Sequence, residues 1–168
     1  EKLTRPQRLR MAFEELGPTY IKLGQALSTR PDLVPVEIAN ELAKLQDEVP
    51  PFSFDEVENV VEAEFGKSSG ELFDELDQQP LASASIGQVH KARLKDGEAV
   101  AVKFQRPGIQ KVIEVDLEIM LHLATLAEHH IKEFEIHRPA KIVQEFARTL
   151  EKEIDYNIEA SHMERIAR

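Results

Sequence analysis

The sequence contains no cysteine and no long apolar run. The lack of cysteine excludes disulfides and cysteine-based metal sites, and it fits a reducing, cytoplasmic location. No segment has the roughly 18 consecutive apolar residues that a membrane-spanning helix needs, so association with the inner face of a membrane would require segments absent from this chain. Basic residues are also scarce, because 21 lysines and arginines are outnumbered by 31 aspartates and glutamates, giving a net charge of −10. This balance argues against nucleic acid as a partner, since such binders rely on cations.

Apolar residues make up 42% of the 168 residues and charged residues 31%, which predicts a soluble globular protein of one ordinary domain. The chain starts at Glu1, and its last residues, MERIAR, stop inside a helical pattern without a cap. We therefore expect it to be a piece of a longer protein.

Residues 1–78 show the apolar spacing of helices separated by proline and glycine. Ser53 and Glu56 have the spacing of a capping box, and Gly66 is suited to end that helix. The expected helices lie at residues 5–16, 20–30, 35–46, 53–66 and 71–76.

From about residue 79 the pattern changes to that of strands. Asp96-Gly97 is a hairpin turn signal between two alternating segments. In the second segment Val100, Val102 and Phe104 share one face, while Ala99, Ala101 and Lys103 share the other. We expect a third strand near Leu81, then a long helix from Ile109 with its core face at Ile113, Leu117, Met120, Leu121, Ala124 and Leu126. A further helix is expected at 140–166.

The strand segment matches two protein-kinase patterns. Residues 82–89, ASASIGQV, align with the phosphate loop G-x-G-x-x-G-x-V, so that Ala82 and Ala84 replace the first two glycines and Gly87 is the third. Residues 100–103, VAVK, match the third kinase strand. Val89 and Ala101 would then contact adenine, and Lys103 would reach the α- and β-phosphates of ATP. The alternatives are a surface lysine on an edge strand and an ordinary turn with small residues.

The alanines predict a stiffer loop than that of a kinase. Glycine lets a loop adopt positive φ and approach phosphates closely, whereas alanine in such a conformation costs roughly 1–2 kcal/mol.

Four separated motifs, KLGQ, LASASIGQVH, VAVKFQRPG and EIDYNIEA, resemble the UbiB-like atypical kinase family, which serves ubiquinone and other isoprenoid-lipid metabolism. The resemblance implies an α+β fold in which a helical N-terminal extension, residues 1–78, packs on a protein-kinase-like N-lobe, residues 79–168. This N-lobe would consist of a small antiparallel sheet plus helices, with the C-lobe absent.

The resemblance also implies roles for the first motif, Lys22, Gly24 and Gln25. In the family this extension folds over the nucleotide pocket and blocks protein substrates. Lys22 and Gln25 would then point into the active site and Gly24 would permit close approach. The residues alone equally fit a solvated helix face with a glycine for packing. A buried Lys22 needs a carboxylate, for which the family's Glu-x-Asp motif offers Glu153 and Asp155.

Glu159 lies where the ion-pair glutamate of the kinase C-helix belongs and is expected to pair with Lys103. Asp155 and Glu159 share a helix face that Glu153 does not share, and a solvated acidic face is the alternative. Ser83 replaces an alanine of several relatives, and its hydroxyl is suited to donate to a phosphate. The candidate catalytic residues are Lys22, Gln25, Glu153, Asp155 and Glu159. The candidate nucleotide-binding residues are Leu81, Ala82, Ser83, Ala84, Ser85, Ile86, Gly87, Gln88, Val89, Ala101 and Lys103.

No catalytic-loop Asp or D-F-G sequence is present, and no metal ligand is assigned. Magnesium would be bound through ligands outside this chain, and we expect the chain alone to be inactive. The expected function is the ATP-binding part of a kinase-like phosphotransfer enzyme, an ATPase that supports quinone or isoprenoid-lipid biosynthesis, with enzymes of that pathway as partners. The alternatives are a pseudokinase-like nucleotide sensor without turnover and a helical interaction module with an incidental hairpin.

Overall fold

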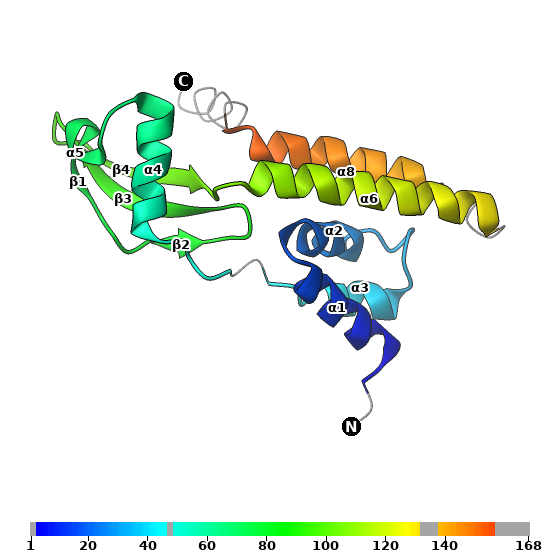
Figure 1. The fold of residues 1–168 in the computed structure, drawn as a ribbon. Coiled ribbons are helices and arrows are strands. Elements are labelled where there is room, and N and C mark those ends of the chain that lie inside the picture. Colours follow the sequence, from blue (N-terminus) through cyan, green and yellow to red (C-terminus); the bar gives the residue numbers. More distant parts are fainter. Residues whose placement is uncertain (1–2, 47–48, 132–137, 157–168) are drawn as a thin grey trace, which may run out of the picture. The chain divides into compact units, whose positions relative to one another are not determined.

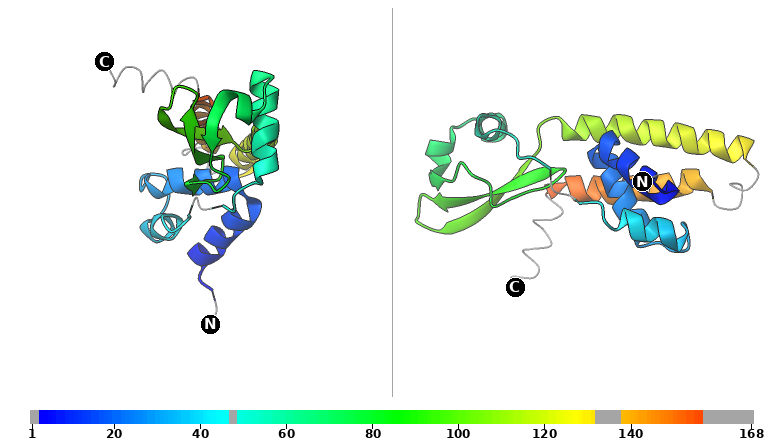
Figure 2. Two further views of the ribbon diagram at one scale, coloured as in Figure 1. Left: turned by 90° about the vertical axis from the view of Figure 1, so that its left-hand side faces the viewer. Right: turned by 90° about the horizontal axis from the view of Figure 1, so that it is seen from below.

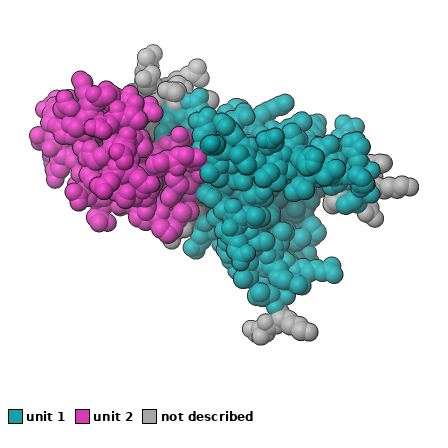
Figure 3. Space-filling model, viewed as in Figure 1, with its two compact units in different colours: residues 1–46, 110–168 teal, residues 47–109 magenta. Residues whose placement is uncertain are grey.

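The computed structural model describes residues 3–46, 49–131 and 138–156, and Figure 1 shows their secondary structure. The chain divides into two compact units, coloured separately in Figure 3. Unit 1 combines Glu1–Gln46 with Gln110–Arg168, and unit 2 consists of Asp47–Ile109.

Unit 1 contains only helices in its described part. Their bounds are α1 Arg5–Leu16, α2 Pro18–Ser28, α3 Val36–Leu42, α6 Ile109–His130 and α8 Pro139–Ile154. Thr4 and Gln7 form a capping box that begins α1. Gly17, at φ 104°, joins α1 to α2 in a conformation that favours glycine.

The core of the first three helices forms around Ile21, Leu42 and Leu45, against which Leu9, Phe13, Leu27 and Ile38 pack. Gly24 is buried beside them. A Cβ at this position would lie 2.3 Å from Leu45 Cδ1 and 2.8 Å from Phe13 Cδ2. Gly24 therefore allows α2 to approach its neighbours more closely than any other residue would.

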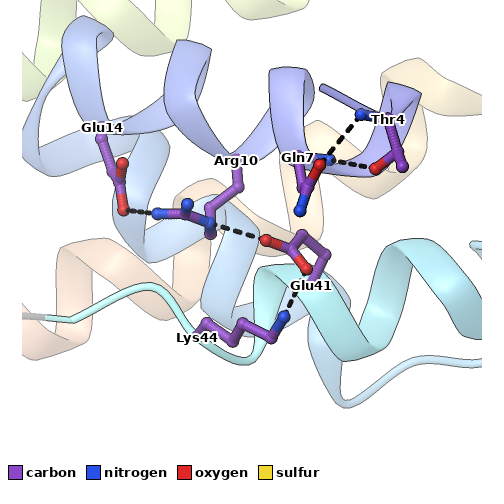
Figure 4. Close-up of polar contacts among 6 residues, drawn as sticks. All are labelled: Thr4, Gln7, Arg10, Glu14, Glu41 and Lys44. Carbon is purple, nitrogen blue, oxygen red and sulfur yellow. Dashed lines mark hydrogen bonds and ion pairs between the residues drawn. The ribbon is translucent and has the colours of Figure 1, made fainter. Parts of the chain in front are cut away.

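An ionic cluster joins α1 to α3 at the surface of this core (Figure 4). Arg10 Nε donates to Glu41 Oε1 at 2.9 Å, and Lys44 Nζ donates to Glu41 Oε2 at 2.6 Å. Arg10 also pairs with Glu14. The hydrogen bonds from Lys44 and Arg10 hold the pKa of the Glu41 carboxyl below its ordinary value.

Unit 2 is built on an antiparallel sheet, seen from two further directions in Figure 2. Its helices are α4 Phe54–Phe65 and α5 Ser69–Leu72, and its strands are β1 Phe73–Leu76, β2 Ala82–Ser83, β3 Gly87–Leu94 and β4 Ala99–Gln105. β3 pairs along its length with β4, while β1 and β2 pair with opposite ends of β3. The expected hairpin and third strand are thus confirmed, and Gly97 has the positive φ that the hairpin turn requires.

One face of this sheet is covered by α4. Phe52, Val57, Val61 and Phe104 form the core there. Burying a side chain of this size contributes about 1.5–3 kcal/mol, so this face, and not the one with Lys103, holds the sheet in place. The Ser53 and Glu56 capping box and the Gly66 end of α4 are confirmed.

Three expectations about elements were wrong. The helix expected at 71–76 ends at Leu72, because Phe73 is buried and pairs with Leu94 in the sheet. The helix expected at 140–166 is interrupted after Ile154, where Asp155 has the extended dihedrals φ −80° and ψ 92°, and residues 157–166 of this expectation lie outside the described residues. Leu126, expected on the core face of α6, is 42% exposed. Within the described segments, no helix combines the length and the apolar character needed to cross a bilayer.

Candidate functional site

The exposed face of the sheet carries the kinase-type row of side chains. Ala82 pairs with Val89, and Val89 pairs with Lys103. Directly opposed residues of antiparallel strands project to the same face, so these three side chains lie in one row across three strands. Ala101 is on the same face two residues before Lys103 and is exposed like it. The row combines small apolar side chains, suited to the flat face of a base, with one ammonium group suited to a phosphate.

The alanine-rich loop connects β2 to β3 without strain. The Ala84 N–H donates to the Gly87 carbonyl at 2.8 Å, and the Leu81 N–H donates to Val89 at 2.7 Å. Arg138 is the only non-glycine residue with positive φ in the described part of the chain. The alanines therefore lie at ordinary negative φ, and the expected penalty for left-handed alanine is absent.

Ser83 projects to the opposite face from Lys103. It pairs with Gln88, which in turn pairs with Phe104 of the core. Its hydroxyl oxygen is buried and has no hydrogen-bond partner among the described residues. A phosphate beside Lys103 would not meet this hydroxyl, which corrects the expectation that Ser83 donates to the ligand through its side chain.

Three further candidates of the loop have buried side chains, namely Ser85, Ile86 and Gln88. Gly87, which pairs with Gln105, is buried as well. These residues could bind a ligand on the exposed face only through their main-chain groups.

Gln88 and His90 form a buried polar network that the sequence analysis missed. The Phe52 N–H donates to Gln88 Oε1 at 2.9 Å, and Gln88 Nε2 donates to the Phe52 carbonyl at 3.2 Å. Gln88 Nε2 is also 2.8 Å from His90 Nε2, and His90 Nδ1 is 2.7 Å from the Asp77 carbonyl. Because a carbonyl can only accept, Nδ1 carries the proton and Nε2 accepts from Gln88. The sequence did contain a signal for this network, because Gln88 and His90 are polar residues at alternate positions of a strand and therefore share one face.

Arg106 is a second residue that the sequence analysis left without a role. Its guanidinium donates to the carbonyls of Pro50, Ser85 and Ala84, at 3.0, 3.3 and 3.4 Å. Its backbone N–H donates to the Ile86 carbonyl at 2.9 Å. The loop is therefore tied to the end of β4 by one residue.

In unit 1, α2 and α8 bring the two family motifs together. Lys22 Nζ donates to Glu153 Oε1 at 2.7 Å, so the carboxylate expected for Lys22 is found. Gln25 Nε2 lies 3.4 Å from the Leu45 carbonyl. Asp155 follows directly after α8 as its C-terminal cap residue. Glu159 lies outside the described residues, and so does its expected pair with Lys103.

A largely apolar groove of about 340 Å³ runs between α2 and α8 beside this ion pair. It is lined by Lys22, Leu23, Gln25, Ala26, Leu27, Arg30, Leu33, Ile142, Glu145, Phe146, Thr149, Leu150 and Glu153. Lys22 and Gln25 thus face a concave surface within unit 1. Lys103 belongs to unit 2, and a single active site that contains both lysines stays a prediction.

The described segments contain no group of three or more histidines and carboxylates arranged to hold a metal ion.

Comparison with known proteins points to kinase-like relatives. A family model described as the ABC1 atypical kinase-like domain matches residues 44–168. Proteins named probable protein kinase UbiB are similar over most of the chain: that of Cellvibrio japonicus is 45% identical over 99% of this chain, and that of Aeromonas hydrophila is 47% identical over 95%. The chain spans about 30% of the length of these relatives.

A solved structure, the complex of Rv3197 from Mycobacterium tuberculosis with erythromycin, is similar with a TM-score of 0.56 and 32% identity. The likeness covers 86% of this chain and 36% of that one. The comparison and the helices with a small antiparallel sheet together confirm the predicted α+β class.

Proposed function

Since this chain belongs to the ABC1 atypical kinase-like domain family, we propose that its unit 2 binds ATP on the exposed face of the sheet. The observation that supports the proposal most is the row formed by Ala82, Val89 and Lys103, with Ala101 on the same face. Adenine would stack on Val89 and Ala101, and the Lys103 ammonium would pair with the α- and β-phosphates.

We further propose that the whole protein is an ATPase that supports quinone or isoprenoid-lipid biosynthesis. The support is the resemblance to UbiB-like kinases, shared by relatives that carry that name. Kinase-like families use magnesium to neutralise the transferring phosphate. The Asp and Asn that would hold the metal are not in this sequence, so the chain by itself should show no magnesium-dependent ATP hydrolysis.

Lys22, Gln25 and Glu153 would act as a cover for this nucleotide site. The support for this role is the family resemblance, and within unit 1 the structure pairs Lys22 with Glu153. A cover held by an ion pair between α2 and α8 would exclude a protein substrate while leaving room for a nucleotide. Replacement of Lys22 in the full-length protein should then raise autophosphorylation.

The test is ATP binding and phosphate release by the full-length protein and its Lys103→Ala variant. We expect the variant to bind ATP at least tenfold more weakly, because a charge-assisted contact contributes about 1.5–3 kcal/mol. Lys95→Ala is the matched control, since Lys95 is an exposed lysine at the tip of the same hairpin. Unchanged ATP affinity in Lys103→Ala would reject the site.

Two other outcomes would identify the alternatives. Binding that depends on Lys103 without any phosphate release would favour a nucleotide-sensing, pseudokinase-like module. Failure of the full-length protein to bind any adenine nucleotide would favour a helical interaction module.

A further inference from the structure

We propose that Arg106 is a positioning residue that holds the alanine-rich loop in a form suited to an anionic ligand. The inference rests on the proposed nucleotide site and assigns to it a residue outside the ligand-facing row. Arg106 donates to three consecutive carbonyls of the loop: Ala84 and Ser85 through its side chain, and Ile86 through its backbone N–H.

The direction of these carbonyls matters for a phosphate. A carbonyl oxygen carries partial negative charge and repels an anion, whereas backbone N–H groups attract it. Because three successive oxygens are directed at Arg106, they are kept from turning toward a ligand on the other side of the loop. The guanidinium also places one positive charge directly behind the loop, where it adds to the charge of Lys103.

The Arg106 side chain is itself fixed by contacts with Phe52 and Pro50. Its guanidinium carbon lies 5.4 Å from the centre of the Phe52 ring, and its Nη2 donates to the Pro50 carbonyl at 3.0 Å. Phe52 is in turn fixed by both backbone hydrogen bonds to Gln88. The guanidinium therefore has little freedom, and a fixed cation behind a loop is more effective than a mobile one.

A lysine could not replace this arrangement. The planar guanidinium offers five donors in a fixed geometry and stacks on an aromatic ring, whereas an ammonium group is a compact, strongly hydrated point charge. Arg106→Lys should retain the charge and the backbone hydrogen bond to Ile86 but lose the simultaneous side-chain contacts with the carbonyls of Pro50, Ala84 and Ser85. This variant separates the effect of geometry from the effect of charge.

The first measurement is hydrogen exchange at residues 82–88 in the nucleotide-free, full-length protein. In Arg106→Gln we expect exchange of these amides to accelerate at least tenfold, while the amides of α4 keep their protection. Arg93→Gln is the matched control, since Arg93 donates from the same sheet to the Gly97 carbonyl at the hairpin tip. Unchanged exchange of the loop in Arg106→Gln would overturn the proposal, and retained protection in α4 shows that the variant is folded.

The second measurement compares the dissociation constants of MgATP and adenosine. We expect Arg106→Gln to weaken MgATP about ten- to hundredfold and adenosine less than threefold, since only the triphosphate meets the loop. Arg106→Lys should give an intermediate loss. Equal losses for both ligands would show a purely structural role and overturn the proposal.

The two measurements distinguish a failure of this inference from a failure of the proposed function. If the unmodified protein binds neither ligand, the proposed function fails. The exchange rates of residues 82–88 then still decide whether Arg106 holds the loop.

Discussion

Lys22 in α2 and Glu153 in α8, which lie 131 residues apart in the sequence, form an ion pair of 2.7 Å. The lysine side chain is 14% exposed and the glutamate side chain 41% exposed, so the pair is neither fully buried nor fully solvated. Its contribution should therefore lie between the 3–5 kcal/mol lost on breaking a buried pair and the roughly 0–1 kcal/mol of a surface pair.

A double-mutant cycle measures this contribution. We expect Lys22→Ala and Glu153→Gln each to lower the free energy of unfolding by about 1–3 kcal/mol, with a coupling of about 1–2 kcal/mol. Urea denaturation is the measurement, and Glu151→Gln, an exposed position in the same helix, is the control. Strict additivity of the two changes would contradict the pair.

Gly24→Ala tests the close packing of α2. Alanine favours a helix over glycine by about 1 kcal/mol, but its methyl group would overlap Leu45 and Phe13. Overpacking of this kind costs typically about 1–3 kcal/mol, so we expect a net loss of up to about 2 kcal/mol in thermal or urea unfolding. Gly70→Ala, with open space around the position, should instead be neutral or stabilising. A more stable Gly24→Ala variant would refute the packing role.

Gln88→Leu removes the centre of the buried polar network. The N–H and carbonyl of Phe52 and the ring nitrogen of His90 would lose their partner in a dry environment. We expect a loss of about 2–3 kcal/mol in the free energy of unfolding, because unsatisfied buried polar groups keep their full desolvation cost. The exposed Gln78→Leu is the control. An effect equal to that of the control would show that the network is not stabilising.

The acid stability of the protein should depend on Glu41. Its pKa is lowered in the folded state by hydrogen bonds from Lys44 and Arg10. The unfolded chain therefore binds more protons, and the stabilisation is complete above the unfolded pKa and is lost as the pH falls through the folded one. Glu41→Gln should flatten the decline of stability below about pH 4.5. The measurement is urea unfolding from pH 7 to pH 3, with the exposed Glu37→Gln as control. An unchanged slope would contradict the assignment.

The sequence predicts local elements well, because their signals are local. The capping box at Ser53, the turn at Asp96-Gly97 and the alternation of β4 each involve residues close along the chain. β1 was missed because its strand conformation depends on pairing with β3, which lies about twenty residues further on and gives no periodic signal in four residues.

The sequence predicts only part of the candidate site, because residue identity shows which motifs are present but not how side chains are oriented. The two motifs offered Glu153 and Asp155 as carboxylate partners for Lys22, and the structure pairs Lys22 with Glu153. The orientation of Ser83 could not be read from the motif, because moving one residue along a strand reverses the face. Arg106 was missed because its partners are main-chain carbonyls, which leave no trace in residue identity.

The division of the chain has a consequence for its synthesis. Unit 1 is assembled from the first and last segments of the chain, with the whole of unit 2 between them. A contiguous unit can fold as soon as it leaves the ribosome, whereas contacts between distant segments form late and slowly. The hairpin and α4 should thus be folded before α8 has been synthesised and can pack on α2. Until then the apolar side of α2 that α8 later covers remains accessible to chaperones on the nascent chain.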